Sequence, residues 1–154
     1  MSARLSKIDE LTLPDHSYLT AEDECYYLGE YTARKGFAFS DTNNLILNFK
    51  KSVSRRGLRD YKYKLQAIAD AAAALRQAIR EEFLREATLV PIPPSRARSD
   101  PLYDDRLLRM LGILGLGLDA DIRELIDQDG STEAFHDTEN RPTPAFSYFS
   151  LLCG

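Results

Sequence analysis

The segment LVPIPPSRARSDPLYDDR, residues 89–106, combines residue types that could bind an anion. An apolar run leads into Pro-Pro-Ser, and the charged residues that follow include Arg96, Arg98, Asp104, Asp105 and Arg106. A strand that ends in a basic loop and then a helix N-terminus is how α/β folds present phosphate-bearing ligands. The segment is therefore the first candidate for a phosphorylated-sugar or nucleotide site.

Each charged group in this segment has two interpretations. Arg96 and Arg98 are either forked donors for phosphate or solvated loop arginines. Asp104 and Asp105 either orient a ribose or a metal, or they offset the dipole of a helix start, which is worth up to about 1 kcal/mol each. The second interpretation is the favoured one for the acids. They are not an acid–base dyad, because adjacent helix positions point about 100° apart.

A second cluster of charge lies at residues 48–64. Its seven basic residues are Lys50, Lys51, Arg55, Arg56, Arg59, Lys62 and Lys64, against the single acid Asp60, although the whole chain has a net charge of −4. Tyr61 and Tyr63 lie among the lysines, and such interleaving is typical of single-stranded nucleic-acid binding by stacking and phosphate contact. A solvated basic loop is the alternative.

The histidines and cysteines predict no metal site. His16 and His136 have no metal-spaced partner, and Cys25 and Cys153 form no ligand pattern. His136 lies in a polar loop and is a weak candidate for ligand contact. No apolar stretch approaches the roughly 18 residues of a membrane span. We therefore expect a cytoplasmic protein without a membrane segment.

The elements that must position these residues alternate in type. We expect a strand at 25–33, a short helix at 42–51 capped by Asp41-Thr42-Asn43, a basic loop at 52–60, and a long helix at 61–85. Its apolar face is predicted to comprise Tyr61, Leu65, Ile68, Ala72, Leu75, Ile79 and Phe83.

Further along, a short strand is expected at 88–92, interrupted by Pro91. A helix is expected at 101–114, with Asp100 as its N-cap, Pro101 in its first turn, and Gly115 and Gly117 at its end. A last strand is expected at 121–126. This order predicts an α/β sheet, with a polar arm at 1–20, the main portion at 21–144 and an apolar tail at 145–154.

The order of these pieces resembles the phosphoribosyltransferase-like family, in particular its competence-type (ComF-like) branch. The matching stretches are LILNFKK (45–51), LVPIP (89–93), PPSRARSDPLYDDRLLRML (93–111) and STEAFHDTENRP (131–142), within residues 25–144. The resemblance implies an incomplete phosphoribosyltransferase-like parallel sheet flanked by helices. It also implies an association with retron-type phage-defence cassettes.

The motif that binds phosphoribosyl pyrophosphate in that family is missing from these residues. It consists of an aliphatic run, two acids and a Thr/Gly loop, and the only Asp pair here is Asp104-Asp105, with no Thr-Thr-Gly after it. We therefore expect a truncated transferase that is inactive alone, and Mg²⁺ with phosphoribosyl pyrophosphate only if the site is completed in trans. The missing strand would leave an open sheet edge for an oligomer or partner to cover.

Two functions follow. In the first, the chain is a transferase fragment that contributes Lys50, Lys51, Arg96, Arg98 and Arg106 to ligand binding, with no catalytic residue assigned. In the second, it is a non-enzymatic module that binds nucleic acid or a protein through residues 48–64.

Overall fold

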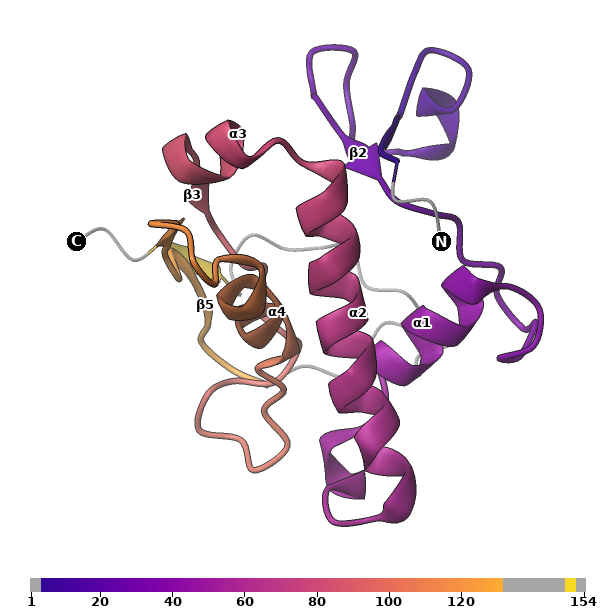
Figure 1. The fold of residues 1–154 in the computed structure, drawn as a ribbon, viewed down its shortest axis with the longest axis vertical. Helices are drawn as coiled ribbons and strands as arrows, with labels where there is room; N and C mark the ends of the chain where they lie inside the picture. Colours follow the sequence, from indigo (N-terminus) through magenta and orange to yellow (C-terminus); the bar gives the residue numbers. More distant parts are fainter. Residues whose placement is uncertain (1–3, 132–148, 152–154) are drawn as a thin grey trace.

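The structure is a computed structural model that describes residues 4–131 and 149–151. Three helices form its centre, with α2 (Lys62–Ala78) lying between α1 (Asp41–Phe49) and α4 (Arg106–Leu114). Figure 1 shows α2 running down the middle of the molecule, with α1 on one side and α4 on the other. Short strands surround these helices, so the chain is α/β only in the broad sense that it combines both kinds of element.

The strands form three separate pairs. β1 (Ser6–Lys7) is antiparallel to β2 (Tyr26–Tyr27), and β5 (Ile126–Gln128) is antiparallel to β6 (Phe149–Leu151). The only parallel pair among the described residues joins β3 (Thr88–Leu89) to β4 (Asp121–Ile122). The parallel sheet that we expected is thus reduced here to two strands of two residues each. The remaining short elements are the 3₁₀ turns Leu13–Asp15, Val53–Arg55 and Arg59–Tyr61.

The core consists of two apolar clusters that share Met110. The first joins Phe49 of α1 to Ala67 and Ile68 of α2. The second joins Ala72 of α2 to Leu84 and Leu114. α2 contributes to both clusters. Its residues there include Ala67 and Ala72, whose small side chains let other helices pack closely against it.

The prediction of one continuous helix over 61–85 is wrong. α2 ends at Ala78, Ile79 and Arg80 are extended, and a separate helix α3 covers Glu81–Glu86. The break turns Leu84 into the core, where it is fully buried, and leaves Phe83 56% exposed. Leu65 is also exposed, so neither it nor Phe83 belongs to the buried face to which the spacing assigned them. Burial of Leu84 against two other helices outweighs the local preference of this sequence for helix.

The helix expected at 101–114 starts five residues later, because α4 begins at Arg106. The carboxylate of Asp100 accepts hydrogen bonds from the amide of Leu102 and the hydroxyl of Ser131, and it pairs with Arg96. These contacts hold residues 97–103 in turns. Gly115 follows the last residue of α4, as predicted, and a Cβ there would lie 3.2 Å from that of Ala120.

The other boundaries also shift. The strands expected at 25–33 and 88–92 contain only two residues each, and the one expected at 121–126 is divided between β4 and β5. α1 lies close to its expected range, but its cap is Ser40, whose hydroxyl accepts from the amide of Asn43 at 3.0 Å. Asn43 is fully buried and binds both backbone groups of Thr32, which anchors the preceding chain to α1.

Candidate functional site

The candidate site begins where the two parallel strands end. β3 ends at Leu89, and the chain continues into segment 91–106. β4 ends at Ile122, and the chain continues into segment 123–127. The amide of Arg123 donates to the carbonyl of Leu89 at 3.0 Å, so the two segments start side by side. Ligands of open α/β sheets bind at this carboxyl edge. A small hollow lies there, lined by Pro91, Ile92, Pro93, Pro94, Arg98, Tyr103, Asp104, Asp105, Leu107, Leu108, Glu124, Ile126 and Asp127.

Arg98 joins the two segments across this hollow. Its Nη2 lies 2.5 Å from Oε1 of Glu124, and its Nε lies 3.3 Å from Oδ2 of Asp127. The hydrogen bond to Glu124 is the main reason that the pKa of Arg98 is raised above its ordinary value. The guanidinium therefore presents a fork of donors at the strand ends, and two carboxylates of the same chain occupy that fork.

Tyr103 is the neutral polar group of the hollow. Burial raises the pKa of its hydroxyl above the ordinary 10.0, although the positive charge of Arg98 opposes that shift. The hydroxyl therefore stays protonated throughout the neutral range. It supplies a hydrogen-bond donor beside Arg98.

Arg96 does not line the hollow. It pairs with Asp100 at 3.3 Å, and the hydroxyl of Ser131 joins the same loop by donating to Asp100 and accepting from the amide of Ala97. The hydroxyl of Ser131 is the main cause that lowers the pKa of Asp100, followed by the amide of Leu102. Arg96 and Arg98 thus stabilise different parts of the loop, although only one residue separates them.

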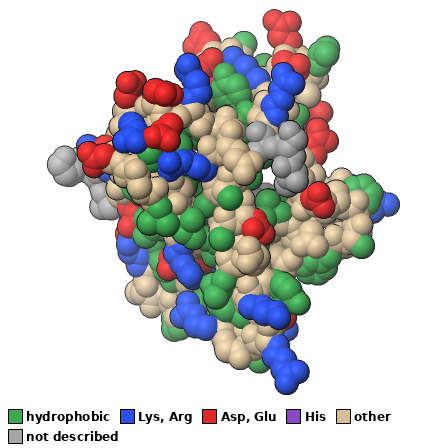
Figure 2. Space-filling model, in the orientation of Figure 1, with side chains coloured by type: hydrophobic (Ala, Val, Ile, Leu, Met, Phe, Trp, Pro, Cys, Tyr) green, Lys and Arg blue, Asp and Glu red, His purple; other side chains and the backbone are tan. Residues whose placement is uncertain are grey.

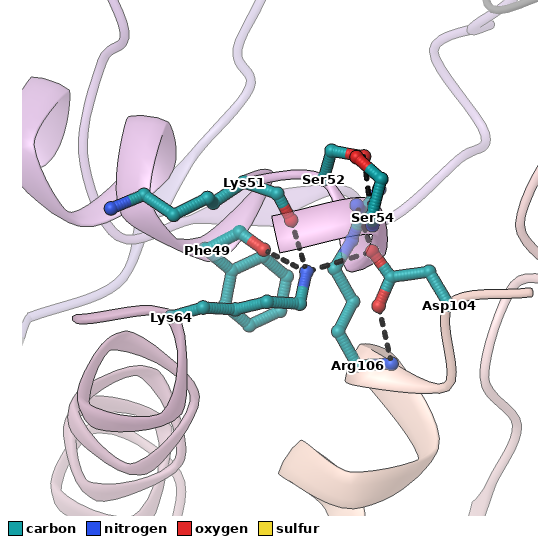
Figure 3. Close-up of polar contacts among 7 residues, drawn as sticks. All are labelled: Phe49, Lys51, Ser52, Ser54, Lys64, Asp104 and Arg106. Carbon is teal, nitrogen blue, oxygen red and sulfur yellow. Dashed lines mark hydrogen bonds and ion pairs between the residues drawn. The ribbon is translucent and has the colours of Figure 1, made fainter. Parts of the chain in front are cut away.

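Asp104 is not a helix-start acid of the kind that the sequence suggested. It is buried, and its Oδ2 lies 2.7 Å from Nζ of Lys64 and 2.9 Å from Nη1 of Arg106 (Figure 3). Its other oxygen accepts from the amide of Arg106 at 3.2 Å. Asp105 is the N-cap residue of α4, but its side chain makes no capping hydrogen bond. Among the described residues, Asp104 but not Asp105 is part of an ion-pair network.

Lys64 is the functional candidate that sequence reasoning missed, since it counted only as one of seven basic residues. Its side chain is 1% exposed, and its ammonium donates to the carbonyls of Phe49 and Lys51 as well as to Asp104 (Figure 3). Burial lowers the pKa of Lys64, while the hydrogen bond to Asp104 opposes this effect. Lys64 lies three and four residues before the buried Ala67 and Ile68, and this spacing was the available signal.

The remaining predicted residues are distributed as follows. Lys51 donates to the carbonyl of Asp60 and pairs with its carboxylate at 3.3 Å, whereas Lys50 is exposed at the end of α1. His136 lies outside the described residues. The described residues contain no cluster of three or more His, Cys, Asp or Glu side chains suited to a metal ion. None of the described helices is long and apolar enough to cross a bilayer.

The basic segment is less uniformly available than its sequence suggests. Lys64 is buried, and both Lys51 and Arg55 pair with Asp60, whose pKa the hydrogen bond from Arg55 lowers. The exposed cations of the segment are Lys50, Arg55, Arg56, Arg59 and Lys62. Figure 2 shows Lys and Arg side chains over the lower end of the molecule, where the turns that precede α2 lie.

Comparison with protein-family models, with curated proteins and with solved structures finds no match to this chain.

Proposed function

We propose that this chain is a phosphoribosyltransferase-like protein whose surface beside Arg98, at the ends of β3 and β4, binds the pyrophosphate group of a phosphoribosyl donor. The observation that carries the proposal is the parallel pair β3–β4, whose carboxyl ends open into the segment 91–106. This is the edge at which α/β sheets bind phosphorylated ligands. The PIPPSRAR sequence supplies the arginine fork at that edge.

The contacts of Arg98 support an anion as the ligand. Glu124 and Asp127 occupy the donors of its guanidinium much as two oxygens of a pyrophosphate would. Binding would therefore exchange these carboxylates for phosphate oxygens. The released acids favour a ligand that carries its own cation, so we propose that Mg²⁺ enters bound to the donor rather than to a site on the protein.

Calorimetric titration with inorganic pyrophosphate and Mg²⁺ tests this proposal. Arg98→Gln should weaken binding by about tenfold or more, because hydrogen bonds to charged groups contribute about 1.5–3 kcal/mol. Arg123→Gln is the matched control, since Arg123 follows β4, the other strand of the pair, but pairs with Asp121 and does not line the hollow. Equal affinity of the wild type and Arg98→Gln would contradict the proposal.

We further propose that these 154 residues do not perform transfer by themselves, because they contain no acid pair followed by a Thr-Thr-Gly loop. Phosphorus NMR of phosphoribosyl pyrophosphate incubated with the purified chain should show no release of pyrophosphate. Measurable turnover would contradict this part of the proposal. A role in retron-type phage defence rests on the sequence resemblance, and plating efficiency of phage on cells that express the chain would test it.

A second candidate function is binding of single-stranded nucleic acid through the segment 48–64. The observation that favours it is Tyr63, which is 51% exposed, has Lys51 and Lys62 within 5.3 Å of its ring centre, and borders a groove of about 380 Å³ between α1 and α2. Exposed aromatic rings beside cations stack on bases. Replacing Tyr63 and Lys62 by Ala should then weaken binding of a fluorescent oligonucleotide, and unchanged binding would exclude this function.

A further inference from the structure

We propose that Lys64 is a positioning residue that holds Lys50 and Arg106 at fixed places relative to each other. Lys50 and Arg106 come from different elements and are both candidate anion ligands. The inference rests on the proposed function, because Asp104, the shared partner of Lys64 and Arg106, also lines the hollow beside Arg98. Lys64 itself is buried and would not touch the ligand.

The first half of the arrangement is the backbone around Lys50. The ammonium of Lys64 donates to the carbonyl of Phe49 at 3.0 Å and to that of Lys51 at 2.8 Å. These carbonyls lie on the two sides of Lys50, at the end of α1, where intrahelical partners run out. Within the described part of the chain, the exposed side chain of Lys50 has no hydrogen bond or ion pair. One buried group therefore fixes the backbone of a cation that remains available to a ligand.

The second half is Arg106 at the start of α4. Oδ2 of Asp104 accepts from both Lys64 and Nη1 of Arg106, and Oδ1 accepts from the amide of Arg106. The guanidinium lies 5.7 Å from the ring centre of Phe49. Its side chain is 24% exposed, so part of it reaches the surface, where an anion could contact it.

The charges explain why a lysine is needed here. Lys64 compensates the buried carboxylate of Asp104, so that the carboxylate does not have to be neutralised by Arg106 alone. The three side chains together carry one net positive charge, and Arg106, the least buried of the three, is the one that can offer it to a ligand. Without Lys64, Asp104 would hold the whole charge of Arg106, and the attraction for an anion would fall.

A double-mutant cycle on pyrophosphate affinity tests this inference. Lys64→Met should weaken binding of inorganic pyrophosphate by about tenfold, which corresponds to roughly 1.4 kcal/mol. In the Arg106→Gln background, the same substitution should change the affinity by less than about threefold, because its effect passes through Arg106. A full effect of Lys64→Met in both backgrounds, or none in either, would overturn the inference. Lys35→Met is the control, since Lys35 is exposed and belongs to neither candidate binding surface.

A second measurement does not depend on any ligand. Hindered rotation of the Arg106 guanidinium should give separate NMR signals for its Nη groups in the wild type and in Lys35→Met. The signals should merge in Lys64→Met and in Asp104→Asn, and the second variant decides the matter if the first does not fold. Signals that stay separate would refute the positioning role. Absence of pyrophosphate binding by the wild type would refute the proposed function instead, and the NMR result would still decide the role of Lys64.

Discussion

The ammonium nitrogen of Lys64 lies 2.7 Å from Oδ2 of Asp104, a residue 40 positions further along the chain. This ion pair connects the first turn of α2 to the turn before α4, and the ammonium also binds two carbonyls at the end of α1 (Figure 3). All three N–H groups of the ammonium therefore have an acceptor. A buried charge with fully satisfied hydrogen bonds specifies one arrangement of the three helices.

Lys64→Met should lower the free energy of unfolding by about 3–5 kcal/mol, because it leaves the buried carboxylate of Asp104 without its lysine partner. Lys62→Met, at an exposed position of the same helix, should change it by no more than about 0.5 kcal/mol. Chemical denaturation followed by circular dichroism measures both. The double variant Lys64→Met/Asp104→Leu should be more stable than Lys64→Met, and a double variant that is less stable would contradict this account.

Leu84→Ala should destabilise the protein by about 2–5 kcal/mol, because Leu84 is fully buried between α2 and α4. Phe83→Ala should cost much less, since the neighbouring ring is 56% exposed. The comparison tests the break between α2 and α3, because one continuous helix would bury Phe83 on the face of Ile79. The same denaturation experiment applies, and a larger loss for Phe83→Ala would favour the continuous helix.

Asn43→Ala should lower the free energy of unfolding by about 1–3 kcal/mol. The amide side chain of Asn43 is the partner of both the N–H and the C=O of Thr32, at 3.0 and 2.9 Å, and it is fully buried. Asn44→Ala, one residue further on the exposed side of α1, is the control. Faster amide hydrogen exchange at Thr32 in Asn43→Ala, but not in Asn44→Ala, would identify the lost contact. Unchanged exchange in Asn43→Ala would argue against it.

The hydroxyl of Tyr103 should ionise at a higher pH than exposed tyrosines, because burial raises its pKa. The unfolded chain loses this proton first, near pH 10, so the stabilising contribution of Tyr103 is complete below that pH. It is lost as the pH rises through the raised pKa of the folded protein. Denaturation of the wild type and of Tyr103→Phe between pH 9 and about pH 12 should show a steeper loss in the wild type. Parallel curves would show that Tyr103 is not perturbed.

Local sequence signals located the helices better than the strands. The polar cap before an apolar stretch located α1 to within a residue or two, and the apolar spacing located most of α2. The same spacing failed at Leu65 and Phe83, because periodicity cannot show which positions another element will cover. The cap predicted at Asp100 failed because its carboxylate binds Ser131, which is 31 residues away.

The sequence by itself determined the order of the main helices, most of the apolar positions on α1 and α2, and the concentration of charge at 48–64 and 89–106. These properties depend on neighbours within one or two turns of helix, which the sequence displays directly. Only the tertiary structure decided that Lys64 is a buried partner of Asp104, that Arg98 spans the ends of two strands, and that α2 and α3 are separate. The reason is physical, since the free energy of burying or pairing a charge depends on groups brought close in space from distant parts of the chain.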